Sequence, residues 1–148
     1  MELFDLIIIG AGPAGTSAGI YASRKKLKSL LITPEFGGQS VVSQEIQNWV
    51  GTPKISGTAL ALRFRAHLMA YAGSTLTIKE GEVVASVSKE NIGFSVKTDK
   101  GNVYGTKTIF IASGSGRRKI EVPGAKELEH KGITYCASCD GPLFDGQD

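Results

Sequence analysis

An apolar run that leads directly into a glycine-rich turn constrains this chain more than any other feature. Residues 6–15 read Leu-Ile-Ile-Ile-Gly-Ala-Gly-Pro-Ala-Gly, so the run is followed at once by the spacing G-x-G-x-x-G. This order predicts a buried strand that turns tightly into a helix. Amides at such a helix start face an anion, and the helix dipole favours negative charge there. The sequence therefore predicts that a dinucleotide pyrophosphate binds at the turn.

The residues of this turn have separate expected parts. Gly10 permits the tight turn, Gly12 lets the backbone approach the phosphates, and Gly15 lets the helix pack closely on the strand. Pro13 falls in the first helical turn, where its missing N–H costs little. Together with Ala14, these residues form the predicted phosphate cradle. A glycine-rich turn that merely joins a strand to a helix is the alternative.

Composition narrows the class of protein further. The 148 residues are 41% hydrophobic and 21% charged, with a formal net charge of +3. These values are ordinary for one globular domain, and the short basic clusters at residues 24–26 and 117–119 do not resemble a nucleic-acid footprint. Acidic residues near the start, and a first apolar run too short to span a bilayer, predict a cytoplasmic protein without membrane insertion.

The segments after the glycine turn predict a β-α-β unit. The helix should continue to about Lys26, and residues 30–32 predict a second buried strand. An acidic residue normally accepts the ribose hydroxyls after such a strand. Here Thr33 occupies the strand end and Glu35 follows two positions later, so either could serve. Gly37, Gly38 and Gln39 nearby also offer a ligand their backbone amides and the side-chain amide of Gln39.

A loop and a second helix are expected next. Residues 48–53, which begin with Asn48, have the composition of a loop that can lie over a ligand. Residues 57–71 have helical spacing. The face that packs inward should carry Leu60, Phe64, Leu68 and Tyr71. His67 lies away from that face and is expected at the surface.

Three short strands are predicted at residues 82–87, 94–98 and 103–106, and they should form an antiparallel meander. Residues 108–112 predict another buried strand, which ends at Ser113-Gly114. Ligands of open α/β sheets bind beyond the carboxyl ends of the strands, so these two residues are expected to meet the ligand. The fold class is therefore α/β, a Rossmann-like parallel sheet with a three-stranded antiparallel insertion.

The two cysteines of the chain, Cys136 and Cys139, form one C-x-x-C. In a reducing compartment this spacing favours redox or metal chemistry over a structural disulfide. The adjacent Asp140 could give or take the proton that disulfide exchange requires. Half of a zinc site and two inert buried thiols are the alternatives. Zinc needs four ligands, and the chain adds only His67 and His130 to the two thiols, so no metal site is expected.

With both motifs identified, the chain resembles the amino-terminal part of a low-molecular-weight thioredoxin reductase, an FAD-containing pyridine-nucleotide disulfide oxidoreductase. Residues 6–15 match the family's FAD fingerprint, residues 37–39 its flavin loop, and residues 46–51 its E-N-W/Y-P-G segment. Residues 111–114 are similar to its A-T-G turn, and residues 136–141, Cys-Ala-Ser-Cys-Asp-Gly, to its C-A-T-C-D-G. The family's second glycine fingerprint, for NADPH, and its closing FAD segment are absent from this sequence.

The resemblance implies a division of labour around the dithiol. Cys139 would lie nearest the flavin and take its electrons, Cys136 would attack the partner disulfide, and Asp140 would handle the proton. Electrons would pass from NAD(P)H through FAD and the dithiol to a thioredoxin-like protein, and the complete enzyme would be a homodimer. The candidate FAD-binding residues are Gly10, Gly12, Pro13, Ala14, Gly15, Thr33, Glu35, Gly37, Gly38, Gln39, Asn48, Ser113 and Gly114.

The predicted domain organisation follows from these motifs. Residues 1–116 are expected to form the amino-terminal part of an FAD-binding domain. Residues 117–148 are expected to be a linker and the dithiol start of a truncated NADPH domain. Two other functions stay open at this point. One is a truncated or split FAD-binding module without turnover of its own, and the other is a related dithiol oxidase.

Overall fold

The computed structural model of this protein describes residues 2–116, 118–129, 131–135 and 145–146. These residues fall into two compact units, Met1–Gly114 and Ser115–Asp148. The first unit contains every helix and strand that the structure describes, and the second is built from turns and loops. Each unit is described by itself.

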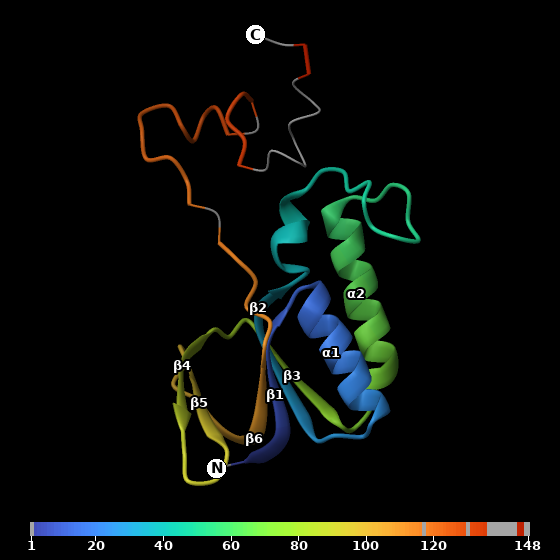
Figure 1. Cartoon of the computed structure of the whole chain (residues 1–148), viewed down its shortest axis with the longest axis vertical. Helices are drawn as coiled ribbons and strands as arrows, with labels where there is room; N and C mark the ends of the chain where they lie inside the picture. Colours follow the sequence, from blue (N-terminus) through green and yellow to red (C-terminus); the bar gives the residue numbers. More distant parts are fainter. Residues whose placement is uncertain (1, 117, 130, 136–144, 147–148) are drawn as a thin grey trace. The chain divides into compact units, whose positions relative to one another are not determined.

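One six-stranded sheet organises the first unit, with its strands in the order β3-β2-β1-β6-β5-β4 (Figure 1). Strands β3, β2, β1 and β6 run parallel, whereas β5 pairs antiparallel with both β4 and β6. The strands are β1 (Leu3–Ala11), β2 (Ser29–Phe36), β3 (Leu76–Glu80), β4 (Val84–Lys89), β5 (Phe94–Thr98) and β6 (Val103–Ile111). The helices are α1 (Pro13–Arg24), the short 3-10 helix η1 (Gly38–Val42) and α2 (Gly57–Ala72).

Apolar side chains are buried on both faces of the parallel strands. Successive residues of a strand point to opposite faces, and both Ile7 and Ile8 are fully buried. Ile8 packs with Leu31 and Leu68 on the face covered by α1 and α2, and Ile7 packs with Leu30 on the other face (Figure 1). Burying each isoleucine stabilises the fold by about 1.5–3 kcal/mol. The unbroken apolar run of β1 therefore follows from a strand that is covered on both sides.

Local signals set the ends of the helices. Pro13 occupies the first position of α1, and Lys26, just beyond its last residue, adopts a left-handed φ of 57° that turns the chain toward β2. The Ser56 hydroxyl accepts a hydrogen bond of 3.2 Å from the Ala59 amide and caps the start of α2. The α/β class and both long helices predicted from the sequence are thus confirmed.

The strand boundaries differ from the predictions in two places. The residues predicted as separate strands at 103–106 and 108–112 form one continuous strand, β6, and β4 begins at Val84 instead of residue 82. Strand β3 was not among the predicted strands. Its sequence, Leu-Thr-Ile-Lys-Glu, alternates only briefly, and pairing with β2 from Ser29 to Thr33 stabilises it through contacts that are distant in sequence.

The burial of two apolar segments also differs from the predictions. Tyr71 is 43% exposed, because it lies at the flank of α2, where its ring contacts His67 and the Arg24 guanidinium. In β6, Phe110 is 42% exposed and Ile111 is 72% exposed. The expectation of a fully buried strand at residues 108–112 is therefore wrong for the described chain.

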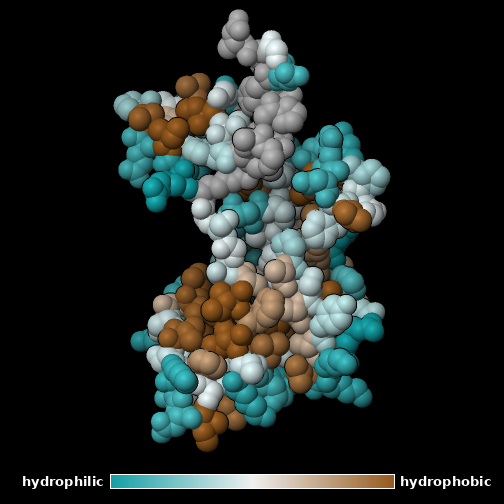
Figure 2. All heavy atoms as spheres, in the orientation of Figure 1, coloured by the Kyte–Doolittle hydropathy of each residue, from teal (hydrophilic) through white to brown (hydrophobic). Residues whose placement is uncertain are grey.

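The pairing of β6 explains this exposure. Strand β1 pairs with β6 from Gly105 to Ile111, but β5 pairs with it only from Val103 to Thr106. Among the described residues, no strand pairs with Lys107–Ile111 on the side away from β1. Figure 2 shows hydrophobic atoms gathered on the side of the unit where β4, β5 and β6 lie. None of the helices in the described ranges is long and apolar enough to cross a membrane.

Candidate functional site

Three loops meet where the parallel strands end. The first turn, after β1, approaches the end of β6, since the position of a Cβ on Gly10 would overlap the carbonyl oxygen of Ala112. The Gly37 amide donates a hydrogen bond of 2.9 Å to the Ala11 carbonyl and so brings the loop after β2 to the same edge. Predicted site residues from these three distant segments, 10–15, 37–38 and 113–114, therefore belong to one edge of the sheet.

Gly10 and Gly15 are required by the fold itself. Gly10 has a φ of 102°, which L side chains rarely adopt. A Cβ on Gly15 would overlap the carbonyl oxygen of Gly10, so α1 can pack against the first turn only with glycine at this position. Backbone atoms cannot move aside as a flexible side chain can. Both glycines are therefore explained without a ligand.

Gly12 is different, because no contact of the fold explains it. Its φ of −72° is open to any residue, and a Cβ there would meet only the Gly38 Cα, at 3.9 Å. Gly12 is also the N-cap of α1, with no side-chain hydrogen bond to the helix amides and no acidic residue in the first turn. The start of α1 therefore presents amide donors and the positive end of its dipole at the Gly12 turn, without a capping side chain.

The loop after β2 forms the other wall of this space. Gly37 and Gly38 have φ values of 93° and 56°, and a Cβ on Gly38 would lie 3.3 Å from the Gly12 Cα. The Ser40 hydroxyl donates a hydrogen bond of 2.5 Å to the Gly37 carbonyl and fixes this turn at the start of η1. Gln39 between them is exposed. The backbones of Gly12 and Gly38 thus approach each other closely beside the predicted phosphate cradle.

The structure distinguishes the two candidates for the ribose contact. Thr33 is 1% exposed, and its hydroxyl donates a hydrogen bond of 2.5 Å to the Glu35 carbonyl. The donor of Thr33 is therefore used inside the protein. Glu35 is exposed at the carboxyl end of β2. Of the two side chains, only the Glu35 carboxylate is presented to a ligand.

The remaining predicted contacts have different settings. Ser113 and Gly114 follow β6 and are exposed, and the Ala112 amide just before them donates a hydrogen bond of 2.9 Å to the Ile9 carbonyl. Asn48 is exposed in an arm of residues 46–55, which Ile46 and Ile55 close by mutual backbone hydrogen bonds. The arm is anchored on α2 by an edge-to-face contact between Trp49 and Phe64, with ring centroids 5.2 Å apart.

Gly57 is a further positioning residue that sequence reasoning missed. A Cβ there would overlap the Ser40 carbonyl oxygen and lie 2.9 Å from the Ser43 carbonyl oxygen. The first turn of α2 therefore rests directly on η1 and on the loop that carries Gly37 and Gly38. A glycine immediately after a serine N-cap was the available signal, because helix interiors seldom favour glycine.

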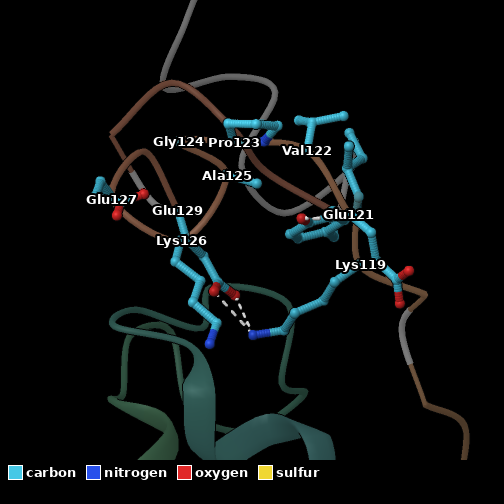
Figure 3. A pocket seen from close by; sticks show the side chains of 11 residues that line it. Lys119, Glu121, Val122, Pro123, Gly124, Ala125, Lys126, Glu127 and Glu129 are labelled. Atoms are coloured by element: carbon cyan, nitrogen blue, oxygen red, sulfur yellow. Dashed lines mark hydrogen bonds and ion pairs between the residues drawn. The ribbon is translucent and has the colours of Figure 1, made fainter.

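The predicted redox residues Cys136, Cys139 and Asp140, together with His130, lie outside the described residues. The residues described in the second unit before this motif are 115–116, 118–129 and 131–135. This part of the unit forms an open pocket of about 540 Å³ that is lined by residues 119–127, Glu129 and Tyr135 (Figure 3). Lys119 pairs with both carboxylate oxygens of Glu129, at 2.7 and 2.8 Å, and the Ile120 amide donates a 3.1 Å hydrogen bond to the Tyr135 hydroxyl. Tyr135, the residue before Cys136, is thereby anchored.

The pKa values of two groups on strands, Asp5 and Tyr104, are shifted, and both groups lie away from the glycine turn. The hydrogen bond from the Lys107 ammonium, with a second from the Lys28 amide, lowers the pKa of Asp5 at the opposite end of β1. Burial raises the pKa of Tyr104, on the strand face that packs with Phe4. Within the described ranges, no group of three or more histidines, cysteines or carboxylates could hold a metal ion. The cradle therefore offers an anion mainly backbone donors.

Comparison with known proteins identifies the family of the chain. A family model described as pyridine nucleotide-disulphide oxidoreductase matches residues 4–147. NADH dehydrogenase of Bacillus subtilis (strain 168) is 33% identical over 147 residues, and the F subunit of alkyl hydroperoxide reductase of Escherichia coli (strain K12) is 34% identical over 146. Each comparison covers 99% of this chain and 28% of the relative, so the chain spans less than a third of these curated relatives.

Solved structures give the same answer for the fold. Thioredoxin reductase from T. acidophilum matches with a TM-score of 0.75 and 33% identity, over 97% of this chain and 46% of its own. Thioredoxin reductase from Streptococcus pyogenes MGAS5005 matches with a TM-score of 0.83 and 32% identity, over 95% of this chain and 45% of its own. The fold, the glycine turn and the extent of the family match together show that the chain belongs to the pyridine nucleotide-disulphide oxidoreductase family.

Proposed function

We propose that the chain is the FAD-binding and dithiol-carrying part of a thioredoxin-disulfide reductase. The observation that carries this proposal is made at Gly12: a Cβ there would meet only the Gly38 Cα, at 3.9 Å, so the fold does not require glycine at this position. The thioredoxin reductases that share the fold support the reaction class. The family model supports a disulphide oxidoreductase more generally, and an alkyl hydroperoxide reductase subunit among the relatives supports an oxidoreductase.

The residues at the edge of the sheet fit FAD by their chemistry. The amides at the start of α1 would hold the pyrophosphate, since the cradle offers backbone donors and no side-chain cap competes for them. The exposed Glu35 carboxylate would accept the ribose hydroxyls, while Thr33 holds the backbone of that loop. Gln39, Asn48, Ser113 and Gly114 would contact the flavin end. When bound, FAD supplies a ring that accepts and returns electron pairs.

The dithiol would carry out disulfide exchange with a protein partner. The Cys136 thiolate attacks one sulfur of the partner disulfide, so an intermolecular disulfide forms and the other partner sulfur leaves as a thiolate. The Cys139 thiolate then attacks Cys136, which releases the second partner thiolate and leaves the Cys136–Cys139 disulfide. Asp140 would carry the proton that the departing thiolate takes up. The oxidised dithiol must be reduced again before the next turnover.

The other parts of the reaction would lie outside this sequence. NAD(P)H would be the electron donor, and no second glycine fingerprint for it occurs in the 148 residues. The partner would be a thioredoxin-like protein, and the complete enzyme would be a cytoplasmic homodimer. A second candidate is an FAD-binding module without turnover of its own. The shares of 28% and about 46% of the relatives' lengths favour it for the 148 residues in isolation.

Flavin retention tests the cofactor site. The purified chain is expected to bind FAD, and Gly12→Val should abolish binding because the added side chain fills the space of the pyrophosphate. Gly116→Val is the matched control, since a Cβ there meets no atom within 4 Å. Flavin absorbance after gel filtration measures the result. Equal yellow colour in wild type and Gly12→Val would rule out the assigned cradle, and a colourless wild type would favour a truncated module that holds FAD weakly, if at all, and has no turnover of its own.

Mixed-disulfide trapping tests the roles of the two thiols. In a chain completed with an NAD(P)H-binding domain, both single Cys→Ser variants should lose disulfide reductase activity. Cys139→Ser should trap an oxidised thioredoxin-like protein through Cys136, because the thiol that would resolve the bond is gone. Mass spectrometry of the adducts identifies the attacking sulfur. Trapping by Cys136→Ser through Cys139 would show that the roles are reversed, and zinc loss without trapping in both variants would support a metal site.

A further inference from the structure

A second pocket lies in the first unit, between β3 and α2. It is open to solvent, has a volume of about 490 Å³ and is lined mainly by apolar residues. Strand β3 contributes Leu76, Ile78 and Glu80, and α2 contributes Met69 and Ala72. None of these residues belongs to the phosphate cradle or to the dithiol, so the proposed function does not explain the pocket.

Strand β3 forms one edge of the sheet (Figure 1). Within the described ranges it pairs with β2 only, from Ser29–Leu76 to Thr33–Glu80. An edge strand leaves a row of backbone N–H and C=O groups without partners in the sheet. An extended peptide satisfies such groups when it adds a strand to the sheet. The free edge of β3 therefore offers backbone hydrogen bonds alongside the pocket.

The face of β3 beneath α2 favours apolar residues in an added strand. Leu76 and Ile78 pack in one cluster with Leu68 and Ala72 of α2, so they point to the face that α2 covers. Lys79 alternates with them along the strand and points to the opposite face. Side chains on the same face of neighbouring strands lie about 5 Å apart and interact. Every second residue of an added strand would therefore contact Leu76, Ile78 and the pocket.

Charge selects the residues on the opposite face. Glu80 is already paired with Arg65 at 3.0 Å, and the Arg65 guanidinium lies over the Phe36 ring, 5.4 Å from its centroid. Lys79 is partly exposed and forms no ion pair with a described residue. Opposite charges on neighbouring strands stabilise their pairing, and a lysine on an edge strand opposes unselective pairing. An acidic strand is therefore favoured over a second copy of β3.

We propose that the free edge of β3 binds an extended segment of a partner protein in which acidic and apolar residues alternate. The apolar residues enter the pocket between β3 and α2, and the acidic residues lie beside Lys79. The inference goes beyond the proposed function and is independent of it, because it uses neither the FAD cradle nor the dithiol. A second copy of β3, or a small apolar molecule in the pocket, would be the other occupants.

Cysteine cross-linking distinguishes a partner segment from a second copy of β3. In a Cys136→Ser, Cys139→Ser background, Thr77→Cys should cross-link under mild oxidation no more than Ser17→Cys, which is exposed on α1. Stronger cross-linking of Thr77→Cys would overturn the proposal in favour of a second copy of β3.

A labelled peptide tests the backbone pairing on the full chain. The probe is the heptapeptide Glu-Val-Glu-Val-Glu-Val-Glu with a fluorophore at its amino terminus, and fluorescence anisotropy measures its binding. N-methylation of its three central residues should weaken binding about tenfold or more, because the methyl groups replace amide hydrogens and prevent strand addition. Equal binding of both peptides would overturn the proposal in favour of a pocket for small apolar groups. A wild type that binds neither peptide would also overturn it.

Charge reversal tests the part of Lys79 with the same probe. Lys79→Glu should weaken binding of the glutamate–valine peptide about fivefold or more and should favour the peptide with lysine in place of glutamate. Lys79→Gln should lie between wild type and Lys79→Glu. Lys97→Glu is the matched control, since Lys97 is exposed on β5, which pairs with strands on both sides. Equal weakening by Lys79→Glu and Lys97→Glu would show attraction by net charge alone and would overturn the proposal.

Discussion

Strands β1 and β6 are neighbours in one sheet, yet in the described chain they differ in burial and in the number of strands that pair with them. Ile9 of β1 pairs with Ile111 of β6. On β1, Ile7 and Ile8 are fully buried between two covering layers, whereas on β6 Phe110 is 42% and Ile111 72% exposed. Strand neighbours flank β1 on both sides, but only on one side of Lys107–Ile111 among the described residues.

This difference distinguishes two parts of the first unit. We call the part around β1 and the phosphate cradle the closed side, and the part around Lys107–Ile111 of β6 the open side. The phosphate cradle is made by contacts within the first unit, chiefly by Gly10, Gly15 and Gly37 against the backbone or α2. Among the described residues, Lys107–Ile111, here called the free half of β6, has no strand partner on the side away from β1 and carries exposed apolar side chains, which invite association. We expect the cradle to fold without further polypeptide and the free half of β6 to govern association and the strength of cofactor binding.

The largest expected effect is on the free energy of unfolding, and it concerns the glycines of the turn after β1. Gly15→Ala should destabilise the chain by about 3 kcal/mol or more, because the new Cβ would overlap the backbone of Gly10. Gly12→Ala should cost no more than about 1 kcal/mol, since its φ is ordinary and its Cβ position is open. Urea unfolding followed by circular dichroism compares the two. Similar losses in both variants would contradict the separate roles assigned to these glycines.

A second prediction concerns the open side. The isolated chain is expected to aggregate or to dimerise non-natively, and to bind FAD more weakly than a full-length relative, because among the described residues Lys107–Ile111 has a strand neighbour on one side only. Ile111→Lys should reduce these assemblies severalfold, since a charge on an edge strand opposes pairing. Light scattering at several concentrations measures the change, with Val103→Lys in the paired half of β6 as control. A monodisperse wild type that keeps stoichiometric FAD would contradict the prediction.

The smallest expected effect lies where the two strands begin. The Lys107 ammonium donates a 2.7 Å hydrogen bond to Asp5 and lowers the pKa of that carboxyl, so the carboxylate is favoured in the folded state. Its contribution is present above the unfolded pKa of about 3.9 and is lost as pH falls through the lower folded value. Asp5→Asn should be slightly less stable than wild type at neutral pH, and the difference should vanish in acid. A constant difference across that range would contradict the assignment.

The sequence predicts the closed side of the molecule well because its signals are local. The apolar run, the glycine spacing and Pro13 are all contained in a dozen residues, and they place β1, the turn and α1 correctly. Strand β3 escapes prediction because its pairing with β2 stabilises it, not its short alternation. The exposure of Ile111 also escapes prediction, because it too depends on strand pairing. Apolar residues predict burial, but only the pairing of β5 with β6 shows that β5 flanks β6 no further than Thr106.

For the candidate site, too, some features could be predicted from the sequence and others needed the structure. Glycine spacing predicted the cradle, but it could not show that Gly10 and Gly15 serve the fold while Gly12 faces open space. That distinction needs the positions of Ala112 and Gly38, which come from distant segments. The choice between Thr33 and Glu35 likewise needed the hydrogen bond that occupies the Thr33 hydroxyl. The roles of Cys136, Cys139 and Asp140 stay predictions.

The central claim is that Gly12 serves a bound dinucleotide and not the fold, and FAD-dependent thermal unfolding tests it most directly. A ligand that binds only the folded state raises the melting temperature as its concentration increases. Wild type and Gly12→Val should melt close together without FAD, and only wild type should shift upward as FAD is added. Equal shifts in both proteins, or a Gly12→Val variant already unfolded without FAD, would contradict the claim.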